Sequence, residues 1–250
     1  PSLVRFLQGA ERFPGRNAVL TFDDGWLDNL VFATPVLQDT GTPAVLALST
    51  GFLHESERTD ARRMADAAVT CDTGFQRARG ENVRDAFLSR TECHELLDRG
   101  VWDIQAHGHT HREVEKNGER MSFLAAAEAS EIERDLCRCR VMLAEIRGSV
   151  PELLFWPWGQ YSETGLTVAR ECGFQATFSV EKGIIRESES RYVLPRISVS
   201  PRWAKFRRNV MIHRHPLLVR LHALCRRRSG GFVSSGHTVD RIDSSGQDVT

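Results

Sequence analysis

The chain has 250 residues, of which 41% are hydrophobic and 26% charged, a composition typical of a globular protein. Lys plus Arg equals Asp plus Glu at 33 each, so net charge does not point to nucleic acid or another charged partner. No run of 18 apolar residues suggests a transmembrane helix, and no long apolar segment near the start suggests a signal peptide. We therefore expect a cytoplasmic or membrane-peripheral protein, with export left open because the sequence begins at Pro1 rather than Met.

The first part of the chain has the pattern of a parallel β/α unit. Residues 17–22 and 43–50 are short β-rich runs, and apolar residues recur with helical spacing over 27–39. A strand, a helix and a second strand in this order build parallel sheets. Residues 54–90 are polar and weakly periodic, and we interpret them as an insertion that contains some helix.

The alternation continues further along the chain. Residues 90–99 are predicted to form a helix that opens with a capping box at Thr91, and residues 102–106 a short strand. A long amphipathic helix is predicted over 122–147. Further predicted elements are a strand at 153–156, a helix at 162–172, a strand at 176–179 and a last strand at 191–199, where Pro195 indicates an edge or a bend. This order favours a β/α barrel or a doubly wound sheet.

The C-terminal part differs in composition. Residues 201–228 contain nine Lys or Arg and no acid, and an apolar stripe runs through Leu217, Leu218, Leu221, Leu224 and Cys225. We interpret this segment as an amphipathic helix that packs on the domain with a solvated basic face, or alternatively contacts an anionic membrane or a partner. Nucleic acid is not an expected partner, because no recognition motif accompanies the charge. Residues 229–250 are Gly/Ser-rich and expected to be disordered.

Two polar motifs follow predicted strands. Asp23 and Asp24 are adjacent carboxylates, which repel each other, and the segment HGHTH offers His107 and His111. If that segment turns helically, these two histidines share a face and can bind zinc or a similar metal. One aspartate would complete a His–His–Asp site, and its neighbour would accept a proton from the metal-bound water. The alternatives are a surface turn for the aspartates and a solvated loop for the histidines.

A third motif, LLFWPWGQY over 153–161, is an apolar strand that leads into a Pro-aromatic-Gly turn. A rigid turn of this kind can line a sugar subsite or direct a backbone N–H at an oxyanion. A buried aromatic turn is the alternative.

TFDDG, the HxxxH cluster and the F-x-P-aromatic-G-x-Y loop occur here in an order that resembles the polysaccharide deacetylase family, carbohydrate esterase family 4 or the NodB-homology domain. The resemblance covers about residues 17–200 and is nearest the poly-N-acetylglucosamine deacetylase-like branch. It implies an α/β fold, a distorted, incomplete (β/α) barrel, for the catalytic domain over 1–200. The implied function is a metal-dependent hydrolase that removes N-acetyl groups from N-acetylhexosamine units of a bacterial exopolysaccharide or cell-surface glycan, by attack of metal-bound water. An amidase acting on peptidoglycan or a small amide, or a catalytically weak glycan-binding protein, is the alternative.

Carried over to this sequence, the resemblance implies that Asp24, His107 and His111 bind a divalent metal, taken as Zn2+ with Co2+ or Ni2+ as alternatives. Asp23 would be the general base. The substrate pocket would be lined by Pro157, Trp158, Gly159 and Tyr161, with the Trp158 backbone N–H helping to hold the oxyanion.

The sequence also departs from the family pattern. Phe155 and Trp156 stand where many members have an arginine that contacts the base, and we assign that role to Arg196. The usual late Leu-x-His, which supplies a general acid, is not evident. Candidates for the acid are His213, His109 and His54, and the choice among them is left open.

Overall fold

The computed structural model describes residues 2–12, 15, 17–81, 84–185, 190–199 and 202–214. Residues 1–181 and 185–196 form one compact unit, and residues 182–184 and 197–250 belong to a second. The candidate catalytic and metal-binding residues named from the sequence all lie in the first unit, apart from His213. The predicted domain boundaries stay predictions.

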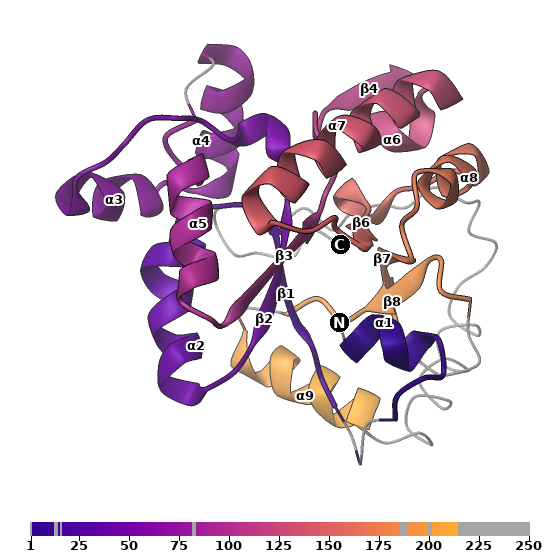
Figure 1. Ribbon diagram of the computed structural model, residues 1–250, viewed down its shortest axis with the longest axis horizontal. Helices are drawn as coiled ribbons and strands as arrows, with labels where there is room; N and C mark the ends of the chain where they lie inside the picture. The colour runs from indigo at the N-terminus through magenta and orange to yellow at the C-terminus, as the bar shows by residue number, and fades with distance from the viewer. Residues whose placement is uncertain are drawn as a thin grey trace. The chain divides into compact units, whose positions relative to one another are not determined.

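A six-stranded sheet forms the centre of the first unit, in the order β1-β2-β3-β6-β7-β8 (Figure 1). The strands are β1 Leu20–Asp24, β2 Ala44–Leu48, β3 Trp102–Ala106, β6 Leu153–Phe155, β7 Ala176–Lys182 and β8 Leu194–Arg196. The pairings from β1 through β7 are parallel. The sheet curls without closing, which confirms the predicted incomplete barrel, and β8 with Pro195 lies at its edge, as predicted.

The register of the sheet places the last residues of β1, β2 and β3 in one row with the penultimate residue of β6. Asp24 pairs with Leu48, Leu48 with Ala106, and Ala106 with Leu154. Because all four strands run in the same direction, this row is the carboxyl edge of the sheet, where open α/β folds place their sites. The chain leaves β1 directly after the two aspartates and leaves β3 directly before the histidine segment.

Helices cover the sheet (Figure 1). They are α1 Ser2–Leu7, η1 Asn29–Ala33, α2 Thr34–Thr40, η2 Thr50–Phe52, α3 Asp60–Ala67, α4 Cys71–Gln76, η3 Arg77–Glu81, α5 Arg90–Asp98, α6 Phe123–Ala126, α7 Ala129–Arg147, η4 Pro157–Gly159 and α8 Glu163–Glu171. The main core joins Leu46, Ile104 and Leu154 of the sheet to apolar residues of α5, α7 and α8. A second core joins Phe155 and other strand residues to α1.

The helix α5 is present, but its predicted cap is wrong. Ser89, in an extended conformation, is the N-cap: its hydroxyl accepts the Glu92 N–H (3.2 Å), and the Glu92 carboxylate accepts the Ser89 N–H (2.8 Å). The capping box therefore lies two residues before Thr91, because the chain adopts helical dihedrals from Arg90 onward.

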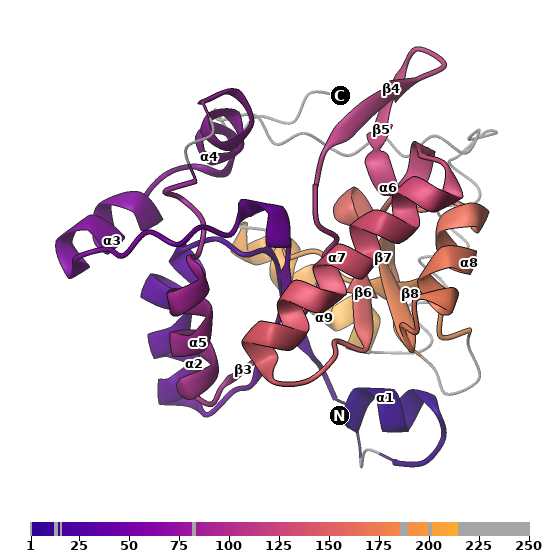
Figure 2. The same ribbon diagram turned by 45° about the horizontal axis from the view of Figure 1, so that its top comes forward.

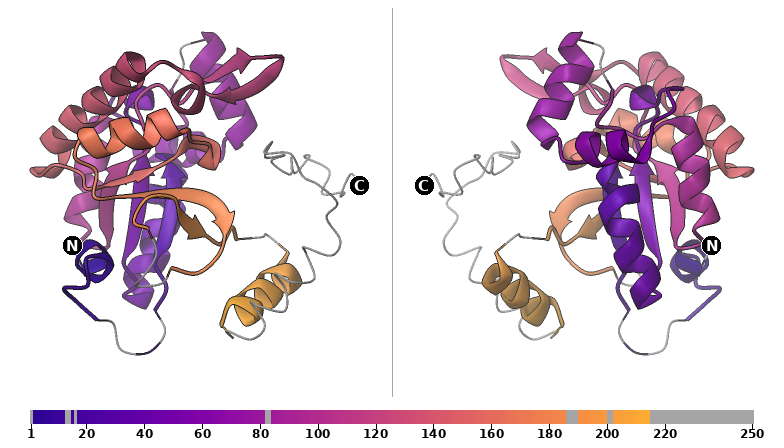
Figure 3. Two further views of the ribbon diagram at one scale, coloured as in Figure 1. Left: turned by 90° about the vertical axis from the view of Figure 1, so that its right-hand side faces the viewer. Right: turned by 90° about the vertical axis from the view of Figure 1, so that its left-hand side faces the viewer.

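The single helix predicted over 122–147 is also wrong. Ala127 and Glu128 have extended backbones that separate α6 from α7, and Glu128 caps α7 in a box with Glu131. Before α6, the strands β4 Glu113–Lys116 and β5 Glu119–Ser122 form an antiparallel hairpin that the sequence analysis did not include. The hairpin projects from the domain in Figure 2 and in both views of Figure 3.

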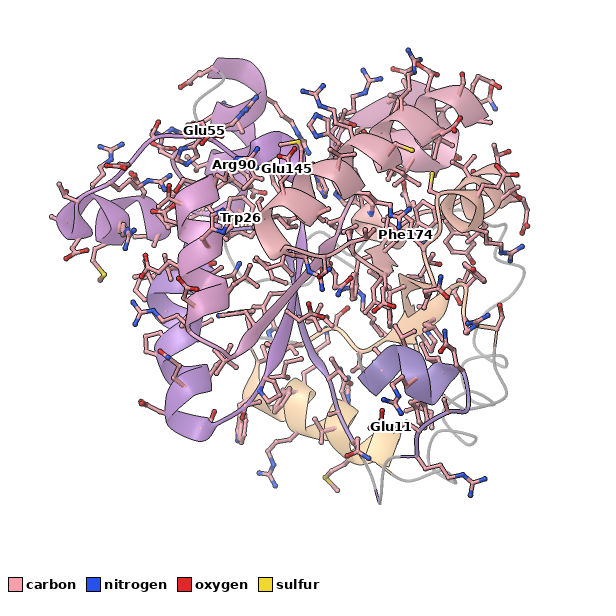
Figure 4. The ribbon with its side chains drawn as sticks, viewed as in Figure 1. Glu11, Trp26, Glu55, Arg90, Glu145 and Phe174 are labelled. Atoms are coloured by element: carbon pink, nitrogen blue, oxygen red, sulfur yellow. The ribbon has the colours of Figure 1, made fainter. Side chains whose placement is uncertain are left out.

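The segment 54–90 contains the helices α3, α4 and η3, and a buried arginine anchors it. The Arg58 side chain is 4% exposed and pairs with Asp66 (3.1 Å) and with Glu92 at the start of α5 (2.5 Å). A second, more exposed arginine, Arg90, pairs with Glu55 (3.1 Å) and with Glu145 of α7 (3.3 Å), as Figure 4 shows. The segment is thus fastened to the barrel at several points.

In the second unit, the structure describes the helix α9 Trp203–Arg214, in which the rings of Trp203 and Phe206 stack at 5.5 Å. The apolar stripe from Leu217 to Cys225 and the tail 229–250 lie outside the described residues. Membrane contact through 201–228 stays a prediction. None of the helices in the described ranges is long and apolar enough to cross a membrane.

Candidate active site

The two aspartates lie at the end of β1, where the backbone changes course. Successive side chains of a strand point to opposite faces, so two adjacent carboxylates would ordinarily diverge. Asp24, however, has a left-handed backbone (φ 76°), which takes its side chain out of the strand pattern. Gly25 follows at φ 93°, and a Cβ there would collide with Leu48 Cδ1. The sharp turn after the aspartates thus explains the glycine of the DDG motif.

Asp24 meets His107 and His111 in the structure. Asp24 Oδ1 lies 3.3 Å from His107 Nε2 and 3.1 Å from His111 Nε2. One ligand atom from each residue can be chosen so that all three lie within 4.8 Å of one another. One carboxylate oxygen and two imidazole nitrogens form a donor set that suits zinc and its neighbours.

The histidines converge without the expected helical turn. Residues 107–111 form an irregular loop in which Gly108 has φ 80° and His111 has φ 39°. The His107 N–H donates to the Leu48 carbonyl of the neighbouring strand (3.1 Å), so the loop starts in register with the sheet. The prediction that an α-helical i, i+4 relation brings the rings together is therefore wrong, although the two rings do meet.

Neighbouring groups orient two of the three side chains for binding a cation. His107 Nδ1 lies 2.8 Å from the Phe155 carbonyl, and because a carbonyl only accepts, Nδ1 carries a hydrogen. Once the ring has lost its second proton, its Nε2 lone pair is available to a cation beside Asp24. Trp26 Nε1 donates to Asp24 Oδ2 (3.0 Å) and leaves Oδ1 facing the histidines. These contacts fit a divalent cation between Oδ1 and the two Nε2 atoms.

The protonation of the three groups is coupled. Burial opposes the ionisation of Asp24, but hydrogen bonds and charge from the two histidines outweigh it and hold its pKa well below the usual range. Burial also opposes the charged form of His107, yet the charge of Asp23 and the contact with Asp24 raise its pKa above the usual value. For His111 burial dominates, and its pKa is lowered.

Asp23 forms a two-pronged ion pair with Arg196. The guanidinium donates from Nη1 to Oδ1 (2.7 Å) and from Nη2 to Oδ2 (2.8 Å). Its Nε donates to the Ser179 carbonyl (2.9 Å), and the guanidinium carbon lies 5.2 Å from the centre of the Phe155 ring. The structure thus places Arg196 next to Asp23, where the sequence analysis assigned it.

The aromatic loop lies partly at the site. The Trp158 ring is 4.2 Å from the His111 ring, and its backbone is left-handed (φ 54°). Pro157 and Gly159 are buried, and a Cβ on Gly159 would collide with Val180. The Tyr161 hydroxyl instead donates to Glu181 (3.1 Å), and its ring lies 6.4 Å from that of Trp156.

The contacts of two candidates for the general acid are described, and those of the third are not. His54 contacts the Phe87 carbonyl (3.1 Å) and the buried Arg58. The His109 ring contacts the Thr50 hydroxyl (2.9 Å). The side chain of His213 lies outside the described residues.

Two residues of the segment 54–90 adjoin the site and were missed from the sequence. The Phe75 ring stacks on the His111 ring, with centres 5.3 Å apart and planes 3° apart. Arg79 donates to the His111 carbonyl (3.0 Å) and lies over Phe75 (4.7 Å). Their spacing of four residues is the one sequence signal that could have placed them on a common helical face.

A family model described as polysaccharide deacetylase matches residues 10–177. The chain belongs to the polysaccharide deacetylase family.

Among curated relatives, the chain is similar to proteins named poly-beta-1,6-N-acetyl-D-glucosamine N-deacetylase. The one from Staphylococcus aureus (strain MRSA252) is 24% identical over 192 residues, which cover 76% of this chain and 56% of the relative. The one from Staphylococcus epidermidis is 25% identical over 203 residues, which cover 80% of this chain and 61% of the relative. The chain therefore spans less than two thirds of the length of these curated relatives.

Solved structures show the same fold. IcaB from Ammonifex degensii superposes with a TM-score of 0.64 at 20% identity, covering 81% of this chain and 76% of that one. A de-N-acetylase from Aggregatibacter actinomycetemcomitans superposes with a TM-score of 0.62 at 21% identity, covering 78% of this chain and 75% of that one.

Proposed function

We propose that this protein is a metal-dependent hydrolase that removes acetyl groups from N-acetylhexosamine units of a bacterial exopolysaccharide or cell-surface glycan. The observation that carries the proposal is the convergence of Asp24, His107 and His111 beside the ion pair of Asp23 and Arg196. The names of the staphylococcal relatives favour poly-β-1,6-linked N-acetylglucosamine as the glycan.

Asp24, His107 and His111 would hold the cation, with Zn2+ proposed and Co2+ or Ni2+ as alternatives. A divalent cation at such a site supplies a Lewis acid that polarises the amide carbonyl and favours ionisation of a water molecule. Three protein ligands leave positions open for water and substrate, as in catalytic rather than structural zinc sites.

Asp23 is the general base in this proposal. Its carboxylate is held by Arg196 and takes a proton from the attacking water. The water oxygen adds to the acetamide carbon, the C–N bond breaks, and acetate and a glycan amine result once the amine nitrogen has gained a proton. The Trp158 backbone N–H would donate to the oxygen that carries negative charge in the transition state.

The experiment is acetate release by the purified protein with Zn2+, Co2+ or Ni2+. The substrates to compare are β-1,6-linked N-acetylglucosamine oligomers, β-1,4-linked chitooligosaccharides and peptidoglycan. We expect release that requires the cation and is fastest on the β-1,6 oligomer. A protein that binds no divalent cation contradicts the proposal. Glycan binding without acetate release identifies a glycan-binding protein instead.

A further inference from the structure

The loop 107–111 carries two of the three proposed cation ligands, yet it contains no helical turn. In a helix, backbone hydrogen bonds would fix the i, i+4 spacing of His107 and His111. Here the backbone is irregular, and buried N–H groups in such a loop need acceptors from elsewhere in the protein. The contacts that supply them also decide where the two imidazoles lie.

Asp135, in the second turn of α7, supplies two of these acceptors. Its Oδ1 accepts the His109 N–H (2.6 Å), and its Oδ2 accepts the Thr110 N–H (2.9 Å). The residue is 5% exposed, and each of its two carboxylate oxygens accepts one of these backbone N–H groups. A buried carboxylate is costly unless it is well hydrogen-bonded, so these two contacts are its main stabilisation.

The opposite side of the loop rests on the chain that leaves β2. Thr50 donates its N–H to the Gly108 carbonyl (3.2 Å), and Gly51 donates its N–H to the His109 carbonyl (2.8 Å). A Cβ on Gly51 would collide with that carbonyl, so the approach is close. The loop is therefore held between Asp135 on one side and Thr50 and Gly51, which follow β2, on the other.

We propose that Asp135 is a positioning residue: it holds the loop 107–111 so that His107 and His111 present their Nε2 atoms at cation-binding spacing. The inference rests on the proposed function, since it assigns a purpose to the cation ligands. Both carboxylate oxygens are needed. An asparagine keeps one acceptor and turns an amide N–H toward a backbone N–H, so Asp135→Asn disturbs the loop with almost no change in volume.

The test compares Asp135→Asn and Asp135→Ala with a matched variant, Thr177→Val. Thr177 is also buried, and its hydroxyl accepts a loop N–H, that of Val193 (3.0 Å). Co2+ is titrated into each folded protein and followed by its visible absorption. Loss of contacts behind a metal ligand typically weakens binding about 10–100-fold, and we expect this and an altered cobalt spectrum for both Asp135 variants. Thr177→Val should keep the wild-type affinity and spectrum.

A second readout is amide hydrogen exchange in the cation-free wild-type protein, which can be measured even if the variants fold poorly. The amides of His109 and Thr110 should exchange their hydrogens slowly, because both are bonded to a buried carboxylate. Exchange at the rate of an open loop would overturn the proposal, as would unchanged Co2+ affinity and spectrum in Asp135→Asn. If the wild-type protein itself does not bind Co2+, the proposed function fails; unchanged binding in the variants alone removes only the role of Asp135.

Discussion

Asp23 and Arg196 belong to the two outermost strands of the sheet, β1 and β8, and their ion pair bridges the open side of the barrel. Both oxygens of the carboxylate are engaged, at 2.7 and 2.8 Å. Such a two-pronged pair fixes the orientation of the carboxylate as well as its distance from the guanidinium. The proposed base is thus held in one orientation beside Asp24, which turns toward the histidines.

Replacement of the base should separate catalysis from cation binding. Asp23→Asn keeps the size of the side chain but removes the proton acceptor, so we expect the rate of acetate release to fall about 100-fold or more. Cation affinity should stay within a few-fold of wild type, because Asp23 is not among the three proposed ligands. Full turnover with bound metal would show that another group is the base.

Replacement of Arg196 by lysine should preserve only part of the catalytic rate. Arg196→Lys keeps a positive charge but cannot form two parallel hydrogen bonds, so kcat should fall while KM changes less. Arg196→Ala should lower kcat further. The matched control is Arg147→Ala, which removes another largely buried arginine, one that pairs with Asp103 (2.8 Å). Equal losses of kcat in the control and in Arg196→Ala would contradict a specific role.

Cation binding should release protons and weaken in acid. The pKa of His107 is raised, because the charges of Asp23 and Asp24 outweigh burial, so near its usual titration range this imidazole is largely protonated in the cation-free protein. A ligand must give up that proton, so affinity for Zn2+ should fall as pH decreases through and below this range. Calorimetry in buffers of different ionisation enthalpy measures the protons released. Affinity independent of pH from 5.5 to 8 (roughly the histidine range) would exclude His107 as a ligand.

The segment 54–90 should depend on its buried arginine for stability. Arg58→Met leaves Asp66 and Glu92 with only the more exposed Arg62 and Arg63 as partners. Breaking a buried pair typically costs about 3–5 kcal/mol, and we expect a loss at the lower end of that range. Urea denaturation measures the change. Arg90→Met is the control, because its partners Glu55 and Glu145 are exposed, and a pair of this kind contributes about 0–1 kcal/mol. Similar losses in both variants would contradict the assignment.

Much of the fold could be read from the sequence because burial imposes simple patterns on it. The runs before Asp23 and His107 are short and apolar, and parallel strands bring their carboxyl ends to one edge. The proximity of the aspartates and histidines followed from that alone. The wrong prediction of one continuous helix over 122–147 has an equally local cause. The apolar periodicity of α6 continues into α7, while the extended residues between the two helices leave no periodic signal.

The rest depended on tertiary contacts that leave little trace in the sequence. Phe75 and Arg79 reach His111 because Arg58 folds the segment 54–90 back on α5. Asp135 is one acidic residue among several on α7, and only its burial distinguishes it. The Asn117-Gly118 pair, by contrast, is a strong hairpin signal that was available in the sequence.

The bridge between the edge strands also sets an order of assembly for the site. The three proposed cation ligands, together with Asp135 and the Phe155 carbonyl that contact their loop, are all present once the chain has been made as far as Phe155. The partner of Asp23, by contrast, lies 173 residues further along than Asp23 itself. Contacts between residues so distant in sequence form late, because closing a long loop is entropically costly. A chain interrupted before β8 can therefore present the proposed cation ligands while the proposed base lacks Arg196. In the proposed assay, acetate release rather than metal content then reports whether this domain has finished folding.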